Sequence, residues 1–236
     1  MKDIEIIPTN TCPPDLSTLA ARTEVFASFA PVIQLDVSDG VFTPVTSWPF
    51  GQGQKESLMA IADRGERLPF ADDVFYETHL MIEAPREIGL LLARAGVKRI
   101  IGHAEAFEDE NDARGTLEAW NAAGVEAGLA LLYHSPLELI DPHVDLCDVV
   151  LLMTIATIGK QGAQFEEGSF ERIRAFKEKY PERIVEVDGG VSEGNIEDLV
   201  RAGASRFGVG SAITKALDQK GAYERLRGLA KKAALD

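Results

Sequence analysis

Polar side chains of catalytic type lie inside apolar segments at three distant places in this chain. Gln34 and Asp36 lie in "VIQLDVSDG", His79 lies in "YETHLMI", and Asp188 lies in "VEVDGG". Alternation along an extended strand puts Gln34 and Asp36 on one face and apolar residues on the other. Carboxylates and imidazoles are the groups that proteins use to transfer protons and to bind metals. A strand with such a polar face therefore calls for a functional explanation.

Eight apolar, β-rich segments supply the elements that must position these residues. Stretches with helical spacing of apolar residues separate them, and "REIGLLLARAG" and "NIEDLVRAG" each run into a glycine that suits a helix C-cap. The crossovers around "QKESLMAIADRG" and "SPLELIDP" have less helical character. The predicted strands cover residues 4–9, 32–39, 75–82, 99–105, 127–134, 149–155, 184–190 and 206–213.

Regular alternation of strand and helix predicts the fold. It indicates a parallel sheet, and eight such units in 236 residues predict an α/β, single-domain (β/α)8 TIM barrel over residues 1–236. The alternative is an open doubly wound sheet, which is disfavoured because no G-x-G-x-x-G motif follows the first strand. Active sites of such barrels lie at the carboxyl ends of the strands, so we expect Asp36, His79 and Asp188 to meet at one rim.

Two glycine-containing turns follow the last two predicted strands. "VDGGVSEGN" and "GVGSAIT" place Gly189, Gly190, Gly210 and Ser211 between a strand and a helix. Main-chain N–H groups at such turns form an anion site, and the loops after strands seven and eight commonly bind phosphate in this fold. The alternative is that these glycines only permit tight turns. Two adjacent turns of this kind favour the phosphate site.

Composition restricts the classes of partner. The net charge of −14 argues against binding to nucleic acid or to a membrane surface. No apolar stretch is long enough to span a membrane, and the N-terminus does not resemble a secretory signal, so we expect a cytoplasmic protein. Cys12 and Cys147 form neither a disulfide framework nor a metal-finger motif. An anion would have to be held by local backbone dipoles or by a few cations against the net negative charge.

Five segments, taken together, resemble the ribulose-phosphate 3-epimerase family. They are "LDVSDGVFTP", "THLMIEAP", "GHAE", "VVLLMTI" and "VEVDGGVSEGNIEDLVRAGASRFGVGSAI", and their order along the chain covers nearly all of it. The last segment alone is unspecific, because many phosphate-binding barrels have a similar one. The combination of "DVxDG", "HLM" and "DGG" is much more specific.

The resemblance implies an isomerase that inverts the carbon beside the ketone of a ketose phosphate, of the ribulose 5-phosphate and xylulose 5-phosphate type, through an enediolate. Asp36 and Asp188 match the two acid/base aspartates. Asp36, His79 and Asp188 match ligands of a divalent metal ion, which would be Zn, Mn, Mg or Fe. The small-molecule sugar phosphate is the expected partner, and we expect Thr9 and Met153 to contact it. Lys160 is either a contact of the phosphate or of a sugar hydroxyl, or a solvated lysine of the loop. The resemblance leaves homo-oligomerisation open.

This chain departs from the family pattern at several positions. Gln34 replaces a histidine ligand, so the site could hold a harder metal, bind metal weakly, or have lost it. Alternatively, Gln34 only fills space and forms hydrogen bonds. The loop "ATIGKQGAQF" after strand six and the Leu132–Tyr133 pair after strand five also differ, which leaves the ketose phosphate undetermined.

Two other functions compete with the epimerase. A phosphate-binding-barrel decarboxylase or aldolase would need a lysine in strand two or three, and "LDVSDG" and "ETHLMI" contain none. A non-catalytic or altered-specificity sugar-phosphate-binding barrel is supported by Gln34 and the altered loops, and retention of both aspartates argues against it.

Overall fold

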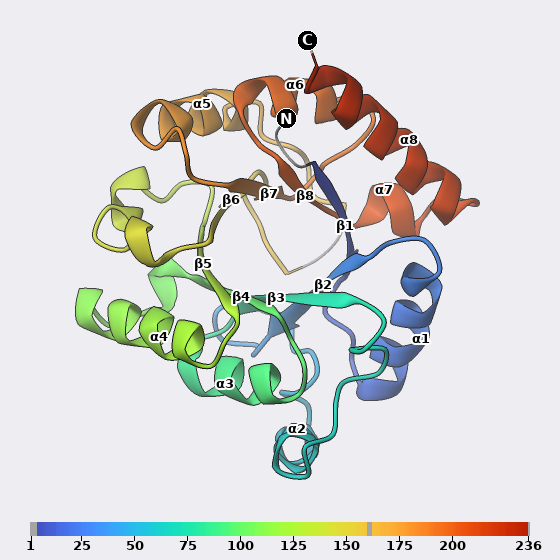
Figure 1. Ribbon diagram of the computed structural model, residues 1–236, viewed down its shortest axis with the longest axis vertical. Coiled ribbons are helices and arrows are strands. Elements are labelled where there is room, and N and C mark those ends of the chain that lie inside the picture. Colours follow the sequence, from blue (N-terminus) through green and yellow to red (C-terminus); the bar gives the residue numbers. More distant parts are fainter. Residues whose placement is uncertain (1–3, 160–161, 236) are drawn as a thin grey trace.

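The protein forms a closed barrel of eight parallel strands in the order β1 to β8, with β8 paired to β1. The computed structural model describes residues 4–159 and 162–235. Figure 1 shows the strands as a central ring and the helices outside it. The β1–β8 pairing confirms the predicted barrel and rules out the open sheet. The strands are β1 Glu5–Asn10, β2 Val32–Ser38, β3 Phe75–Met81, β4 Arg99–His103, β5 Glu126–Leu131, β6 Val149–Met153, β7 Val185–Asp188 and β8 Arg206–Val209.

Helices connect successive strands around the barrel. They are α1 Leu16–Ala27, α2 Gln54–Asp63, α3 Arg86–Arg94, α4 Glu110–Ala122, α5 Ser169–Lys179, α6 Ile196–Ala202, α7 Ser211–Thr214 and α8 Gln219–Ala233. Short 3-10 turns cover Ala104–Ala106, Leu137–Ile140 and Val144–Leu146. The crossover after β5 contains only two of these turns, since Pro136 and Pro142 lack the N–H that a continuous helix needs.

The strands are buried on both faces, as in other parallel sheets. In β2, Ile33, Leu35 and Val37 belong to the apolar core, while Gln34 and Asp36 are buried on the other side of the strand. The predicted alternation is therefore confirmed. It places polar groups in the barrel interior, where apolar packing would otherwise be expected.

Several predicted strands extend beyond the observed ones. β5 ends at Leu131 rather than at 134, and β8 ends at Val209 because Ser211 begins the short helix α7. Apolar content alone does not mark where a strand stops, since Ala212 and Ile213 pack just as well from a helix. Asp188 is the last residue of β7, as predicted.

A deeper layer of the interior holds ionisable side chains that need partners. Arg99 donates hydrogen bonds to Glu77 over 2.5 Å and to Glu126 over 2.6 Å. Arg206 adds ion pairs to Glu5 and Glu126. Burial, followed by the neighbouring charge of Glu77, raises the pKa of Glu186 well above its ordinary value. This layer fills the barrel below the site described next.

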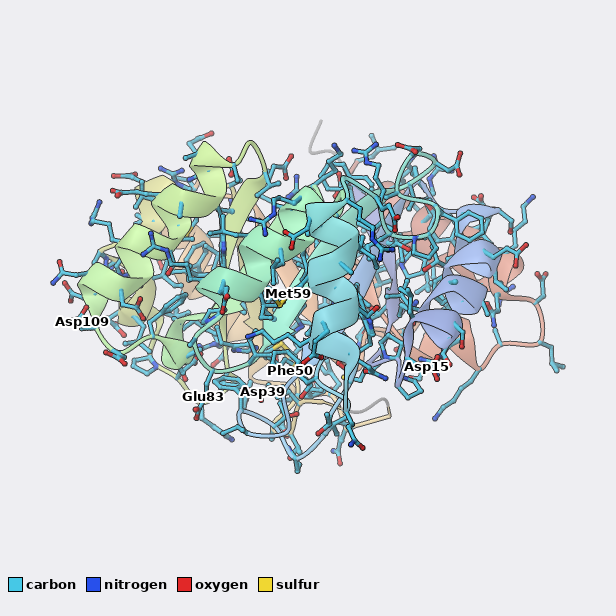
Figure 2. The ribbon with its side chains drawn as sticks, turned by 90° about the horizontal axis from the view of Figure 1, so that it is seen from below. Asp15, Asp39, Phe50, Met59, Glu83 and Asp109 are labelled. Carbon is cyan, nitrogen blue, oxygen red and sulfur yellow. The ribbon has the colours of Figure 1, made fainter. Side chains whose placement is uncertain are left out.

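The carboxyl ends of the strands open on one side of the barrel. Figure 2 shows Asp15, Asp39 and Glu83, which follow β1, β2 and β3, along the lower side of the molecule. Across residues 4–159 and 162–235, no helix combines the length and apolar character needed to cross a membrane.

Candidate active site

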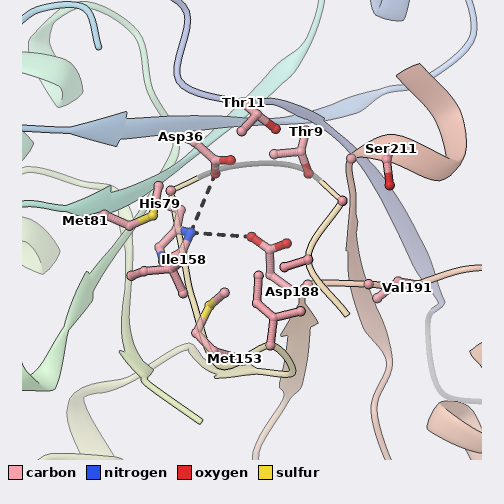
Figure 3. A pocket seen from close by; sticks show the side chains of 17 residues that line it. Thr9, Thr11, Asp36, His79, Met81, Met153, Ile158, Asp188, Val191 and Ser211 are labelled. Atoms are coloured by element: carbon pink, nitrogen blue, oxygen red, sulfur yellow. Dashed lines mark ion pairs between the residues drawn. The ribbon is translucent and has the colours of Figure 1, made fainter. Parts of the chain in front are cut away.

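Asp36, His79 and Asp188 meet at the carboxyl end of the barrel. The register of β2 against β3 pairs Asp36 with His79, and Asp188 approaches from the end of β7. Nδ1 of His79 lies 3.6 Å from Oδ1 of Asp36 and 3.5 Å from Oδ2 of Asp188 (Figure 3). The predicted cluster is therefore present, with one imidazole nitrogen facing both carboxylates.

Gln34 links the two carboxylates directly. Its Nε2 donates to Oδ1 of Asp36 over 2.7 Å and to Oδ2 of Asp188 over 2.8 Å. Gln34 is fully buried, and its Oε1 accepts no hydrogen bond from the described part of the chain. In this rotamer the amide nitrogen, which has no lone pair for a metal, faces the carboxylates. Rotation of the amide by half a turn would present the oxygen instead.

The electrostatics of this cluster favour a positive charge between the carboxylates. Burial and the nearby charge of Asp188 raise the pKa of Asp36. Burial lowers the pKa of His79, but attraction to Asp188 and Asp36 outweighs it and raises that pKa to about 9. A proton on Nδ1 of His79 or a metal ion would meet the same need.

The residues present fit a divalent metal. One ligand atom from each of Asp36, His79 and Asp188 can be chosen so that all lie within 4.8 Å of one another. Nδ1 of His79 is buried and makes no hydrogen bond to any residue of the described ranges. Two carboxylates and one imidazole suit Zn, Mn or Fe, whereas Mg prefers oxygen ligands alone.

A cavity opens beside the cluster, and main chain from both glycine-containing loops lines it. Gly189 and Gly190 adopt φ of +114° and +67°, a region that favours glycine. A β-carbon on Gly189 would approach Ile155 to 2.6 Å, so the loop packs too closely for another residue. The cavity is lined by Thr9, Thr11, Asp36, His79, Met81, Met153, Ile155, Ile158, Gly159, Gly162, Ala163, Asp188, Gly189, Gly190, Val191, Gly210 and Ser211.

The structure places the predicted substrate contacts as follows. Thr9 and Met153 line the cavity, and the buried hydroxyl of Thr9 has no hydrogen-bond partner in the described ranges. Lys160 lies outside the described residues. No lysine or arginine lines the cavity among residues 4–159 and 162–235.

Sequence reasoning missed several residues of the site. Met81 lies two positions after His79 and so shares its face of β3, a signal that alternation provides. Ile158 comes from the loop after β6, where no periodic pattern exists. Gly208 was also missed: a β-carbon there would lie 2.8 Å from Oε1 of Gln34 and 3.1 Å from Cγ of Asp188.

Comparison with known proteins shows which protein family this chain resembles in sequence. The model of the ribulose-phosphate 3 epimerase family matches residues 13–214. The chain is 34% identical over 197 residues to the ribulose-phosphate 3-epimerase of Chlamydia muridarum, covering 80% of this chain and 79% of the relative. It is 32% identical over 205 residues to the Bacillus subtilis enzyme of the same name, covering 84% and 87% of the two chains.

Similar solved structures come from other barrel enzymes. The 3-keto-L-gulonate-6-phosphate decarboxylase of Vibrio cholerae superposes with a TM-score of 0.68 at 14% identity, covering 98% of this chain and 99% of the other. The 3-hexulose-6-phosphate synthase of Salmonella typhimurium gives a TM-score of 0.67 at 14% identity, covering 98% of this chain and 100% of the other. At such identities the likeness shows the fold alone.

Proposed function

We propose that this chain interconverts D-ribulose 5-phosphate and D-xylulose 5-phosphate. The chain belongs to the ribulose-phosphate 3-epimerase family. The chain is an isomerase of the epimerase type acting on a pentose phosphate. The observation that carries the proposal is the pair of carboxylates, Asp36 and Asp188, which face one imidazole beside a cavity lined by both glycine-containing loops.

The two aspartates exchange the proton at C3. One carboxylate removes the proton from one face of the carbon, and the other returns a proton to the opposite face. Asp36 on β2 and Asp188 on β7 approach the cavity from different strands, so a sugar between them presents one face to each (Figure 3). Burial and the charge of Asp188 raise the pKa of Asp36, so a proton is held more readily there than in water.

Asp36, His79 and Asp188 would hold a divalent metal ion, with Gln34 as a fourth ligand when its amide oxygen faces the site. When bound, such an ion supplies Lewis-acid stabilisation of negative charge on the substrate oxygens. The amide of Gln34 favours a harder ion than the histidine of the family pattern would. We propose Mn or Fe ahead of Zn for this reason.

The phosphate is held by the main chain of the loops after β7 and β8. Gly189, Gly190, Gly210 and Ser211 contribute N–H groups and one hydroxyl, which can bind a dianion without a cationic side chain. Thr9 and Met153 also line the cavity, and we propose both as contacts of the sugar. Lys160 remains a proposed phosphate contact.

The test is conversion of D-ribulose 5-phosphate by the purified chain, followed by proton NMR, without metal and with added Mn²⁺, Mg²⁺, Fe²⁺ or Zn²⁺. We expect xylulose 5-phosphate to appear, and its rate to depend on the metal. Binding of the sugar phosphate without conversion under every condition would contradict the proposal and support the altered-specificity binding barrel.

A further inference from the structure

The second ring nitrogen of His79 faces another histidine. Nε2 of His79 lies 2.8 Å from Nε2 of His103, at the end of β4, and both side chains are fully buried. A hydrogen bond of this length between two imidazoles needs a proton on one nitrogen and a lone pair on the other. The contact alone does not decide which histidine donates.

Glu105, which contacts His103 on the side away from His79, determines which of the two histidines donates the hydrogen bond. Nδ1 of His103 lies 3.3 Å from Oε2 of Glu105, and Oε1 of Glu105 accepts a hydrogen bond of 2.9 Å from the main-chain N–H of Leu132. An ionised carboxylate can only accept, so His103 donates from Nδ1. His103 is fully buried, so a second proton on its ring would place an unsolvated charge in the barrel interior, and the ring carries a single proton.

The direction of the whole chain of hydrogen bonds follows. A neutral His103 that donates from Nδ1 has only a lone pair at Nε2. His79 must then donate from its own Nε2, which leaves its Nδ1 as the nitrogen that faces Asp36 and Asp188 with an exchangeable proton or a lone pair. Packing of Phe42 against His103, with ring centroids 4.8 Å apart, restricts rotation of that ring.

We propose that His103 and Glu105 are positioning residues that fix the proton of His79 on Nε2 and so reserve Nδ1 for a cation between the two aspartates. In its metal-binding part this inference rests on the proposed function, because it takes His79 as a ligand. Partners of this kind fix the tautomer and the ring orientation of a ligating histidine. Leu132, whose N–H anchors Glu105, belongs to one of the loops in which this chain departs from the family pattern.

The tautomer can be read directly by long-range proton–nitrogen NMR correlation of the metal-free, ¹⁵N-histidine-labelled protein at neutral pH. We expect His103 as the neutral Nδ1–H form, which is distinct from the Nε2–H form in this spectrum, and a retained proton on Nε2 of His79. A neutral Nε2–H form of His103 would overturn the proposal. This readout requires neither metal nor substrate.

The substitution Glu105→Gln supplies a second test, because it should reverse the donor and acceptor roles in the hydrogen bond between residue 105 and His103. The amide oxygen would keep the bond from Leu132, and the amide NH2 would then face Nδ1 of His103. We expect His103 to move its proton to Nε2, His79 to carry its proton on Nδ1, and Mn²⁺ affinity to fall by roughly 10–100-fold. The matched control is Glu108→Gln, an exposed carboxylate of the same segment, which should leave tautomers and affinity unchanged.

The outcomes separate this inference from the proposed function. If wild-type protein binds Mn²⁺ and converts the sugar phosphate, but Glu105→Gln has the same tautomers and affinity, the positioning role is wrong and the epimerase stands. If wild-type protein shows the expected tautomers but no conversion, the epimerase proposal fails and the arrangement of His79 stands. If Glu105→Gln does not fold, the wild-type spectrum still decides the tautomer.

Discussion

The side chain of Gln34 on β2 donates a hydrogen bond of 2.8 Å to Asp188 on β7, a residue 154 positions further along the chain. The same nitrogen donates to Asp36 over 2.7 Å. One amide therefore holds two carboxylates near each other, although their charges repel at this distance. Gln34, one of the positions at which this chain departs from the family pattern, thus joins the two proposed acid/base groups.

The substitutions Gln34→His and Gln34→Leu test this role. Gln34→His introduces an imidazole ligand, and we expect Zn²⁺ affinity to rise by roughly 10-fold or more. Gln34→Leu removes the donor from both buried carboxylates, and we expect it to lower the free energy of unfolding of the metal-free protein by about 1–3 kcal/mol. Calorimetric titration and denaturant unfolding measure the two effects. Unchanged Zn²⁺ affinity in Gln34→His would exclude position 34 from the metal site.

Asp36→Asn and Asp39→Asn compare two aspartates of the motif "DVSDG". Asp36 faces the cavity, whereas Asp39 accepts hydrogen bonds from the N–H groups of Val41, Phe42 and Glu83. We expect Asp36→Asn to lower the turnover rate by roughly 10²–10⁴-fold and to keep or raise the melting temperature, since a neutral amide relieves a buried charge.

The matched variant Asp39→Asn should behave in the opposite way. Its amide nitrogen cannot accept the bond from Glu83, so we expect a loss of about 1–3 kcal/mol in stability while most of the activity remains. Turnover measured alongside thermal unfolding distinguishes the two variants. Equal loss of activity in both would mean that the motif acts only through its fold.

Gly208→Ala tests the close packing beneath the site. Its β-carbon would lie 2.8 Å from Oε1 of Gln34 and 3.1 Å from Cγ of Asp188, so both side chains must shift. Because misplacement by about 1 Å can cost roughly 100-fold in rate, we expect a loss of that order. The control is Gly228→Ala in α8, where an added β-carbon would have no neighbouring atom within 4 Å. We expect it to add about 1 kcal/mol of stability and to leave the activity unchanged.

Glu186→Gln tests the buried carboxylates below the site. Burial, together with the charge of Glu77, raises the pKa of Glu186 above its ordinary 4.5, so the folded state holds the proton more tightly than the unfolded state. The stability that this proton contributes is complete below pH 4.5 and is lost as the pH rises through the folded value. We expect Glu186→Gln to gain stability relative to wild type as the pH rises from about 5 to about 8.

Urea unfolding at a series of pH values measures this difference. The exposed Glu182→Gln is the control, because this side chain lies in solvent in the folded protein and its replacement should change stability by the same amount at every pH. A stability difference for Glu186→Gln that does not change with pH would show that Glu186 titrates normally in the folded protein.

Much of the site could be predicted because its residues lie on strands with a clear period of two. Asp36, His79 and Asp188 each follow an apolar pattern, and a closed parallel barrel brings the carboxyl ends of all strands together. The two glycine-containing loops were predicted to lie at the same rim, and both line the cavity. These residues are far apart in the sequence, and the prediction that they meet followed from the barrel topology and not from a local sequence pattern.

Other features of the site depend on three-dimensional packing that no local sequence pattern specifies. The direction of the Gln34 amide depends on contacts from β2 to β7, and no local pattern encodes it. The links from His79 through His103 to Glu105 depend on ring positions across two strands. Arg99, which donates a hydrogen bond to one carboxylate oxygen of Glu77, is identified as its partner only by the packing of β3 against β4.

The most direct test of the central claim is the early incorporation of deuterium when the protein converts D-ribulose 5-phosphate in D2O. Two aspartates on opposite faces of C3 predict that newly formed xylulose 5-phosphate carries deuterium at C3, while unconverted ribulose 5-phosphate at low conversion carries little. Deuterium appearing equally in both sugars from the start would indicate a single base, and would contradict the assignment of Asp36 and Asp188 as opposed acid and base.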